Sequence, residues 1–62
     1  MELRVANNLI VSLDGLQTLL NLGLLDVSGN KVADQRELLR LKHNRSLREL
    51  VLRENPIAEG KP

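Results

Sequence analysis

One stretch of eleven residues, 22–32, constrains the fold more than any other part of the chain. It carries apolar residues at its first, fourth, sixth and eleventh positions and an asparagine, Asn30, at its ninth. Leu25 and Val27, at the fourth and sixth positions, have the spacing that places side chains on one face of a β-strand. Ser28-Gly29-Asn30 then predicts a sharp bend. There the asparagine amide can bond backbone groups that the bend leaves unpaired.

This pattern occurs three times, with its asparagine at Asn8, Asn30 and Asn55. The asparagines are 22 and then 25 residues apart, within the period of about 20–29 residues of one class of strand-containing repeat. Of the twelve apolar positions in the three copies, eleven fall within the chain, and all eleven hold Leu, Ile or Val. Each copy therefore predicts one short strand followed by a bend.

The segments between the copies follow a different spacing. Over residues 13–22 a leucine recurs every third residue, which predicts a 3₁₀ or similarly tight connection, and Asp14-Gly15 supplies the turn that starts it. Residues 34–41 read instead as one or two turns of α-helix. Asp34 is the predicted N-cap, and Glu37 three residues later completes a capping box.

These residues resemble the intracellular leucine-rich repeat family, in particular its short class of 22-residue repeats known from phosphatase-regulatory and from ciliary or cytoskeletal proteins. The likeness is carried by residues 8–32 and 47–57, and the latter end in Asn55-Pro56-Ile57. The resemblance implies an α/β fold. In that fold, a leucine-rich repeat solenoid, short parallel β-strands form the concave side and 3₁₀ or α-helical connections the convex side.

The length allows a single domain, residues 1–62, made of about three partial repeats. The chain has no aromatic residue and no cysteine, so its core must be aliphatic and without disulfides. Such a solenoid needs roughly three repeats and covered ends for stability. We therefore expect a fragment of a longer solenoid, continuous with or packed against further repeats. The alternative is a short protein that folds only against a partner.

Catalysis and metal binding are not expected. The chain has one histidine, His43, with Ser46 as the nearest serine, and nothing in the sequence indicates an oxyanion hole beside them. Its carboxylates lack metal-ligand spacing, and its four glycines are isolated. We expect no enzyme, no cofactor and no small-molecule substrate. No apolar run approaches the roughly 20 residues that cross a bilayer, so we expect no membrane partner and a cytoplasmic location.

The second half of the chain is basic, although the formal net charge of the whole is only +1. Five basic side chains fall within thirteen residues: Arg36, Arg40, Lys42, Arg45 and Arg48. One hypothesis is a basic loop that contacts nucleic acid, the ribosome or another acidic partner. The other is a solvated helix face, which the sequence favours because no aromatic side chain is present to stack on bases.

The strand residues between the buried positions are expected on the concave face of the sheet. Alternate side chains of a strand point to opposite sides, so the three copies predict rows across the sheet. The rows are Glu2, Leu24, Glu49; then Arg4, Asp26, Val51; and then Ala6, Ser28, Arg53. Leu24 and Val51 are apolar and have charged neighbours, as in a protein-binding surface, although single exposed apolar residues are also ordinary. The predicted contact residues are Arg4, Leu24, Asp26, Glu49, Val51 and Arg53.

The first functional prediction is therefore a protein–protein interaction or scaffolding module of a larger cytoplasmic assembly. The resemblance adds cytoskeletal and ciliary assemblies as settings for it. Two alternatives stay open. One is a segment of a regulatory subunit that binds a phosphatase or another enzyme. The other is contact with nucleic acid or the ribosome through the basic loop, which would be steeply salt-dependent.

Overall fold

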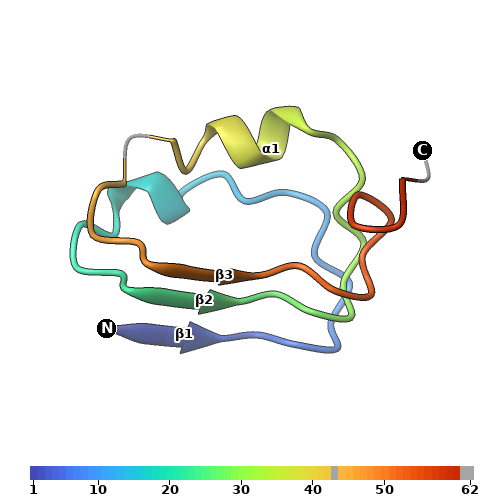
Figure 1. Cartoon of the computed structure of the whole chain (residues 1–62), viewed down its shortest axis with the longest axis horizontal. Helices are drawn as coiled ribbons and strands as arrows, with labels where there is room; N and C mark the ends of the chain where they lie inside the picture. Colours follow the sequence, from blue (N-terminus) through green and yellow to red (C-terminus); the bar gives the residue numbers. More distant parts are fainter. Residues whose placement is uncertain (43, 61–62) are drawn as a thin grey trace.

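Three short strands form one parallel sheet in a computed structural model of the chain, which describes residues 1–42 and 44–60. The strands lie in sequence order, β1-β2-β3, and two helical segments connect them (Figure 1). The elements are β1 (Glu2–Arg4), the 3₁₀ helix η1 (Leu16–Thr18), β2 (Leu24–Asp26), α1 (Arg36–Leu39) and β3 (Glu49–Val51). The parallel sheet and its helical connections agree with the predicted α/β class.

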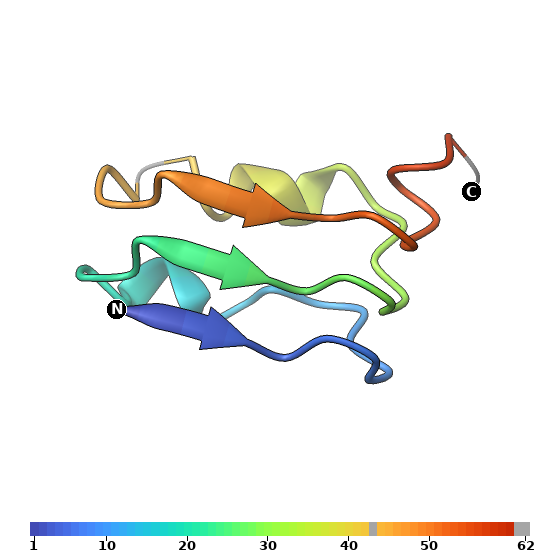
Figure 2. The same cartoon turned by 60° about the horizontal axis from the view of Figure 1, so that its bottom comes forward.

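The sheet has one covered face and one open face. Both connections lie on the same side of the sheet, and in the described residues no segment crosses the other side (Figures 1 and 2). Each connection leaves the end of one strand and returns to the start of the next, as parallel pairing requires. The core lies between the sheet and the connections.

The core is aliphatic and is built from the predicted apolar positions. Leu25 and Val27, expected on the inner face of the central strand, are completely buried. Their equivalents in the two outer copies pack against the same cluster but are only partly buried, because each lies on an edge strand or just beyond it. The six buried apolar residues are Leu13, Leu22, Leu25, Val27, Val32 and Leu41.

The asparagines of the second and third copies each join their own bend to the preceding copy, which extends the predicted role. The side-chain amide of Asn30 donates to the Val27 carbonyl in its own bend (2.8 Å) and to the Val5 carbonyl across the sheet (3.0 Å). Its oxygen accepts the N–H groups of Asn8 and Ile10, both at 3.1 Å. Buried backbone groups are therefore satisfied by one side chain that reaches both copies.

Asn55, which is completely buried, repeats this arrangement one copy later. Its amide donates to the carbonyls of Leu52 (3.0 Å) and Val27 (2.9 Å), and its oxygen accepts the Val32 N–H at 3.0 Å. The two asparagines thus link three copies in series.

A left-handed residue precedes each asparagine. The φ angles are 60° at Asn7, 68° at Gly29 and 62° at Glu54. A side chain disfavours this conformation, and only glycine adopts it without cost. The shared conformation turns the chain out of each strand in the same way. The sequence shows it only indirectly, because glycine occupies just one of the three positions.

The predicted cap of α1 forms only in part. The residue before the helix is Gln35, whose backbone is already helical and whose side chain makes no capping bond. Asp34, one residue earlier, accepts the N–H of Arg36 at 2.8 Å, as a capping side chain does. The capping box does not form, because Glu37 turns away from its own helix and bonds the Leu13 N–H at 2.7 Å. The hydrogen bond that Glu37 accepts from the preceding connection thus replaces the capping-box bond expected at the start of its own helix.

Candidate functional site

The register of the sheet confirms two of the three predicted rows across the strands. Glu2 pairs with Leu24, and Leu24 pairs with Glu49. Arg4, Asp26 and Val51 form the next row in the same way. We call this surface the open face; it consists of Glu2, Arg4, Leu24, Asp26, Glu49, Val51 and Arg53. Arg53 follows β3 and belongs to the third predicted row.

Burial separates the open face from the core side of each strand. In the central strand Leu25 is buried, whereas Leu24 and Asp26 on either side of it are only half-buried. Val51 of β3 is half-buried as well, and Glu49 is exposed. Two apolar side chains on neighbouring strands therefore reach a surface that is otherwise charged.

Most of the charges on the open face are tied to one another or to polar neighbours. Arg4 and Glu2 form an ion pair at 3.2 Å with both side chains largely exposed. Such exposed pairs contribute little to stability. Asp26 accepts the hydroxyl of Ser28 at 2.7 Å and its N–H at 3.0 Å, which fixes the carboxylate at the centre of the face.

These contacts keep Asp26 ionised. The hydrogen bond from the Ser28 hydroxyl holds the pKa of Asp26 below its usual value, and the Ser28 N–H acts in the same direction. The positive charges of Arg53 and Arg4 lower this pKa further. At neutral pH the face therefore presents a fixed negative charge beside Leu24 and Val51.

The five residues of the predicted basic patch differ in whether they form ion pairs. Arg36 bonds Asp34 at 2.7 Å, and Arg40 bonds Glu37 at 2.9 Å and Asp14 at 3.4 Å. Carboxylates thus neutralise two of the five charges. The other three, Lys42, Arg45 and Arg48, are exposed and form no ion pair within the described part of the chain.

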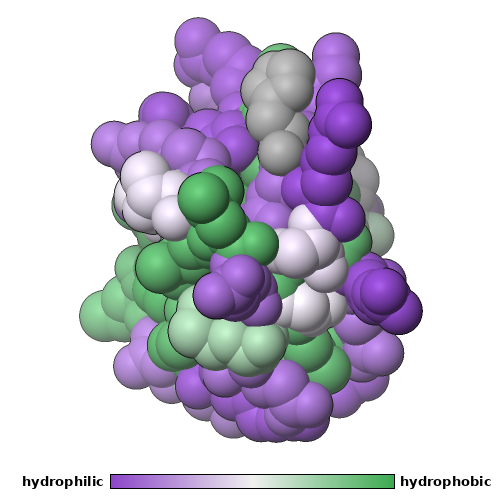
Figure 3. Space-filling view, turned by 90° about the vertical axis from the view of Figure 1, so that its left-hand side faces the viewer, coloured by the Kyte–Doolittle hydropathy of each residue, from purple (hydrophilic) through white to green (hydrophobic). Residues whose placement is uncertain are grey.

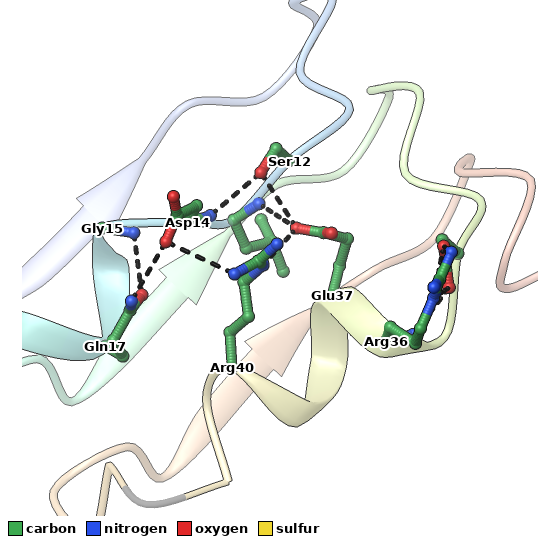
Figure 4. A network of polar contacts seen from close by, with 9 residues as sticks. Ser12, Asp14, Gly15, Gln17, Arg36, Glu37 and Arg40 are labelled. Carbon is green, nitrogen blue, oxygen red and sulfur yellow. Dashed lines mark hydrogen bonds and ion pairs between the residues drawn. The ribbon is translucent and has the colours of Figure 1, made fainter.

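Glu37 is the centre of a polar network that sequence reasoning missed (Figure 4). Its Oε1 atom accepts the Leu13 N–H (2.7 Å), the Ser12 hydroxyl (3.0 Å) and Arg40 Nε (2.9 Å). Its side chain is only 12% exposed. The Leu13 N–H contributes most to holding the pKa of Glu37 below its usual value, followed by Arg40. All the hydrogen-bond partners of Glu37 named here belong to the network itself, so we assign the network a structural role.

Two features were searched for in the described residues, a pocket and a group of metal-ligating side chains. No pocket is found among residues 1–42 and 44–60, and no three of their His, Cys, Asp or Glu side chains are grouped closely enough to hold a metal ion. His43 lies outside the described residues. None of the helices in this part of the chain has the length and apolar composition needed to cross a bilayer.

Comparison of the chain with protein-family models, curated proteins and solved structures gives no match. A function is therefore inferred from the open face and from the resemblance in sequence.

Proposed function

We propose that the chain is part of a leucine-rich repeat solenoid whose open face, the concave side of the repeats, recognises a protein partner. The observation that carries this proposal is the register that brings Leu24 and Val51 onto neighbouring strands within a charged surround. An apolar centre with a polar rim is the usual anatomy of a protein interface. The resemblance in sequence supports an intracellular assembly of the cytoskeletal or ciliary kind as the setting of this recognition.

The backbone links behind this face support a recognition role. Asn30 and Asn55 each bridge two copies, so the three strands are held in one register. A repeat fold of this kind presents side chains from a fixed backbone, and partner choice then depends on the side chains alone. Binding needs little ordering of the surface and so loses little conformational entropy.

The basic patch is the weaker candidate. Arg36 and Arg40 already pair with carboxylates, and no aromatic residue is present to stack on bases. A phosphatase-regulatory role would use the same open face, so the identity of the captured partner distinguishes it from scaffolding.

The test is affinity capture from a cell lysate with four forms of the full chain, followed by mass spectrometry. Leu24→Asp and Val51→Asp place a charge at the centre of the open face. Leu39→Asp is the matched control, because Leu39 is 61% exposed on α1, on the other side of the sheet. Circular dichroism of each form verifies that it folds.

The expected result is one set of proteins captured by the wild type and by Leu39→Asp and lost with both open-face variants. Equal capture by all four folded forms would rule the open face out. Capture that is equal in all four forms and disappears with added salt would favour the basic patch instead.

A further inference from the structure

Asp14-Gly15 is the only place in the chain where a glycine follows an aspartate or an asparagine. Neither of the other two aspartates, Asp26 and Asp34, precedes a glycine, and none of the asparagines does. The step matters chemically because a backbone nitrogen can attack the side-chain carboxyl group of the residue before it. Glycine presents no side chain that hinders this attack. The sequence therefore contains one dipeptide suited to rearrangement into isoaspartate.

The dipeptide lies on the surface at the start of η1. Both residues are exposed, and the Asp14 side chain keeps 65% of its surface open to solvent. A Cβ added to Gly15 would meet nothing within 4 Å apart from its own chain neighbours. Gly15 has φ 99°, in the left-handed region that glycine adopts without cost. Water thus reaches the two groups that would react.

A single side chain holds both of these groups (Figure 4). The Gly15 N–H donates to Oε1 of Gln17 at 2.7 Å, and Nε2 of Gln17 donates to Asp14 Oδ1 at 3.1 Å. Attack requires that the Gly15 nitrogen lose its hydrogen and that the carboxyl group turn towards this nitrogen. Both movements are opposed while the two bonds persist. We call this pair of hydrogen bonds the Gln17 clasp.

The second connection restrains the same carboxyl group from outside the turn. Nη1 of Arg40 lies 3.4 Å from Asp14 Oδ1, and Nε of Arg40 donates to Glu37 at 2.9 Å. The Asp14 N–H donates to the Ser12 hydroxyl at 3.1 Å, and that hydroxyl donates to Glu37 at 3.0 Å. The fold of two copies therefore holds Asp14 in place, and the unfolded chain lacks these restraints.

The rearrangement would lengthen the backbone between two residues of the core. Leu13, directly before the dipeptide, is completely buried, and Leu16, directly after it, packs against the same cluster. An isoaspartyl link adds one carbon to the main chain, because the side-chain carbon becomes part of it. The two leucines then no longer have the separation that their places in the core require.

The first connection runs from this dipeptide to an end of the molecule that is already apolar. Leu20, in the turn between η1 and β2, is 75% exposed. Figure 3 looks at this end and shows hydrophobic surface gathered there. Leu22, at the end of the same turn, is completely buried. Displacement of the first connection would add buried leucine to this surface, and large exposed apolar surfaces promote association.

We propose that Asp14-Gly15 is a site of spontaneous isoaspartate formation and that the Gln17 clasp controls its rate in the folded chain. The Gly15 nitrogen attacks Cγ of Asp14 and closes a five-membered imide, while the amide hydrogen and the hydroxyl of the carboxylic acid leave as one water. A second water then opens the imide. Opening at the side-chain carbonyl restores Asp14, and opening at the backbone carbonyl leaves the chain linked through Cγ, as isoaspartate. This modification does not depend on recognition by the open face.

The test is incubation of the full chain at neutral pH, followed by mass spectrometry that distinguishes isoaspartate from aspartate and locates it. Gln17→Ala removes the clasp, and Gln17→Met replaces this variant if it does not fold. Thr18→Val is the matched control, because the exposed Thr18 bonds the Gly15 carbonyl at 2.6 Å, a group that takes no part in ring closure. Circular dichroism verifies the fold of each form. Parallel incubation in guanidinium chloride gives the rate without the fold.

The expected result is isoaspartate at residue 14, formed roughly threefold to tenfold faster in folded Gln17→Ala than in the folded wild type. Thr18→Val stays near the wild type. In guanidinium chloride all forms react at one rate, which exceeds that of the folded wild type. The modified chain, separated by chromatography, melts at a lower temperature than the unmodified chain.

Four outcomes would overturn the proposal. The first is isoaspartate that appears earlier at another residue, and the second is its absence at residue 14 even in guanidinium chloride. The third is an equal rate in the folded wild type and the folded Gln17 variant, which would mean that the clasp has no effect. The fourth is a folded wild type that reacts as fast as the unfolded chain.

Discussion

At the scale of single residues, a few buried polar side chains determine how the copies fit together. In the described residues no buried side-chain nitrogen or oxygen lacks a hydrogen-bond partner. Asn30 and Asn55 serve the bends, and Glu37 serves the connections. Removing one partner from such a contact leaves a buried polar group without a hydrogen bond. The free-energy cost of this is larger than the net contribution of the bond itself.

Asn30→Ala is expected to lower the free energy of unfolding by about 1–3 kcal/mol, because the N–H groups of Asn8 and Ile10 lose their partner. The control is Asn8→Ala, since Asn8 is exposed and its side chain bonds only its own bend. Urea unfolding of both variants measures the difference. Equal loss in the two variants would mean that the bridging bonds add nothing.

Glu37 makes the free energy of unfolding depend on pH in the acidic range. Its pKa in the folded chain lies below the value of 4.5 for the free side chain, held down first by the Leu13 N–H and then by Arg40. The folded state therefore binds protons less readily than the unfolded state. The resulting stabilisation is complete above about pH 4.5 and is lost as the pH falls through the folded pKa. The pKa of Asp26 and that of Asp34 are also lowered and add to the same trend.

We expect the thermal midpoint to fall between pH 6 and pH 3, and to fall less in Glu37→Gln, which is already less stable at pH 6. The control Glu59→Gln changes an exposed carboxylate that forms no ion pair among the described residues, and it should follow the wild type. Circular dichroism melts over this pH range provide the comparison. An unchanged pH dependence in Glu37→Gln would contradict the assigned role.

At the scale of elements, three-residue strands persist because each ends in the same bend. The left-handed residue at Asn7, Gly29 or Glu54 turns the chain, and the asparagine after it bonds the exposed backbone. The predicted capping box failed at this scale. Local spacing suggested that Glu37 would serve its own helix, whereas the Leu13 N–H of the preceding connection competes for it. A local pattern cannot reveal a competing partner that lies 24 residues away.

Gly29→Ala tests the bend directly. Gly29 has φ 68°, and an added Cβ would collide with the Asn7 side chain and approach the Asn7 backbone nitrogen to 3.3 Å. We expect a destabilisation of roughly 1–3 kcal/mol from strain. Gly23→Ala is the matched control, because a Cβ there meets its nearest atom at an ordinary 3.7 Å. Similar unfolding midpoints for the two variants would argue against a left-handed residue 29 packed closely on Asn7.

At the scale of the whole molecule, the repeated pattern was enough to predict the strands, their order of pairing and the rows of the open face. Leu25 and Val27 were predicted to lie in the core because two apolar residues two positions apart, just before a bend, indicate one face of a β-strand. The Glu37 network was not predictable. It depends on which groups other segments bring close, and the sequence of one segment does not contain that information.

Leu25→Ala is expected to unfold most of the molecule. Leu25 is completely buried at the centre of the core, and such truncations cost roughly 2–5 kcal/mol, a large share of the stability of a small domain. Leu39→Ala, at a side chain 61% exposed, should leave the melt nearly unchanged. Cooperative melting of both variants at the wild-type midpoint would mean that the core lies elsewhere.

The central claim is that the three segments pair in the one register that brings Leu24 and Val51 to the same face. A slip of one residue would move every strand side chain to the opposite face. Amide hydrogen exchange, followed by NMR on the 62-residue chain, tests this register directly. The predicted result is slow exchange at Val5, Asn7, Val27 and Gly29, whose N–H groups bond across the sheet, with fast exchange at Arg4 and Ala6. Slow exchange at Arg4 and Ala6 with fast exchange at Val5 and Asn7, or fast exchange throughout, would contradict it.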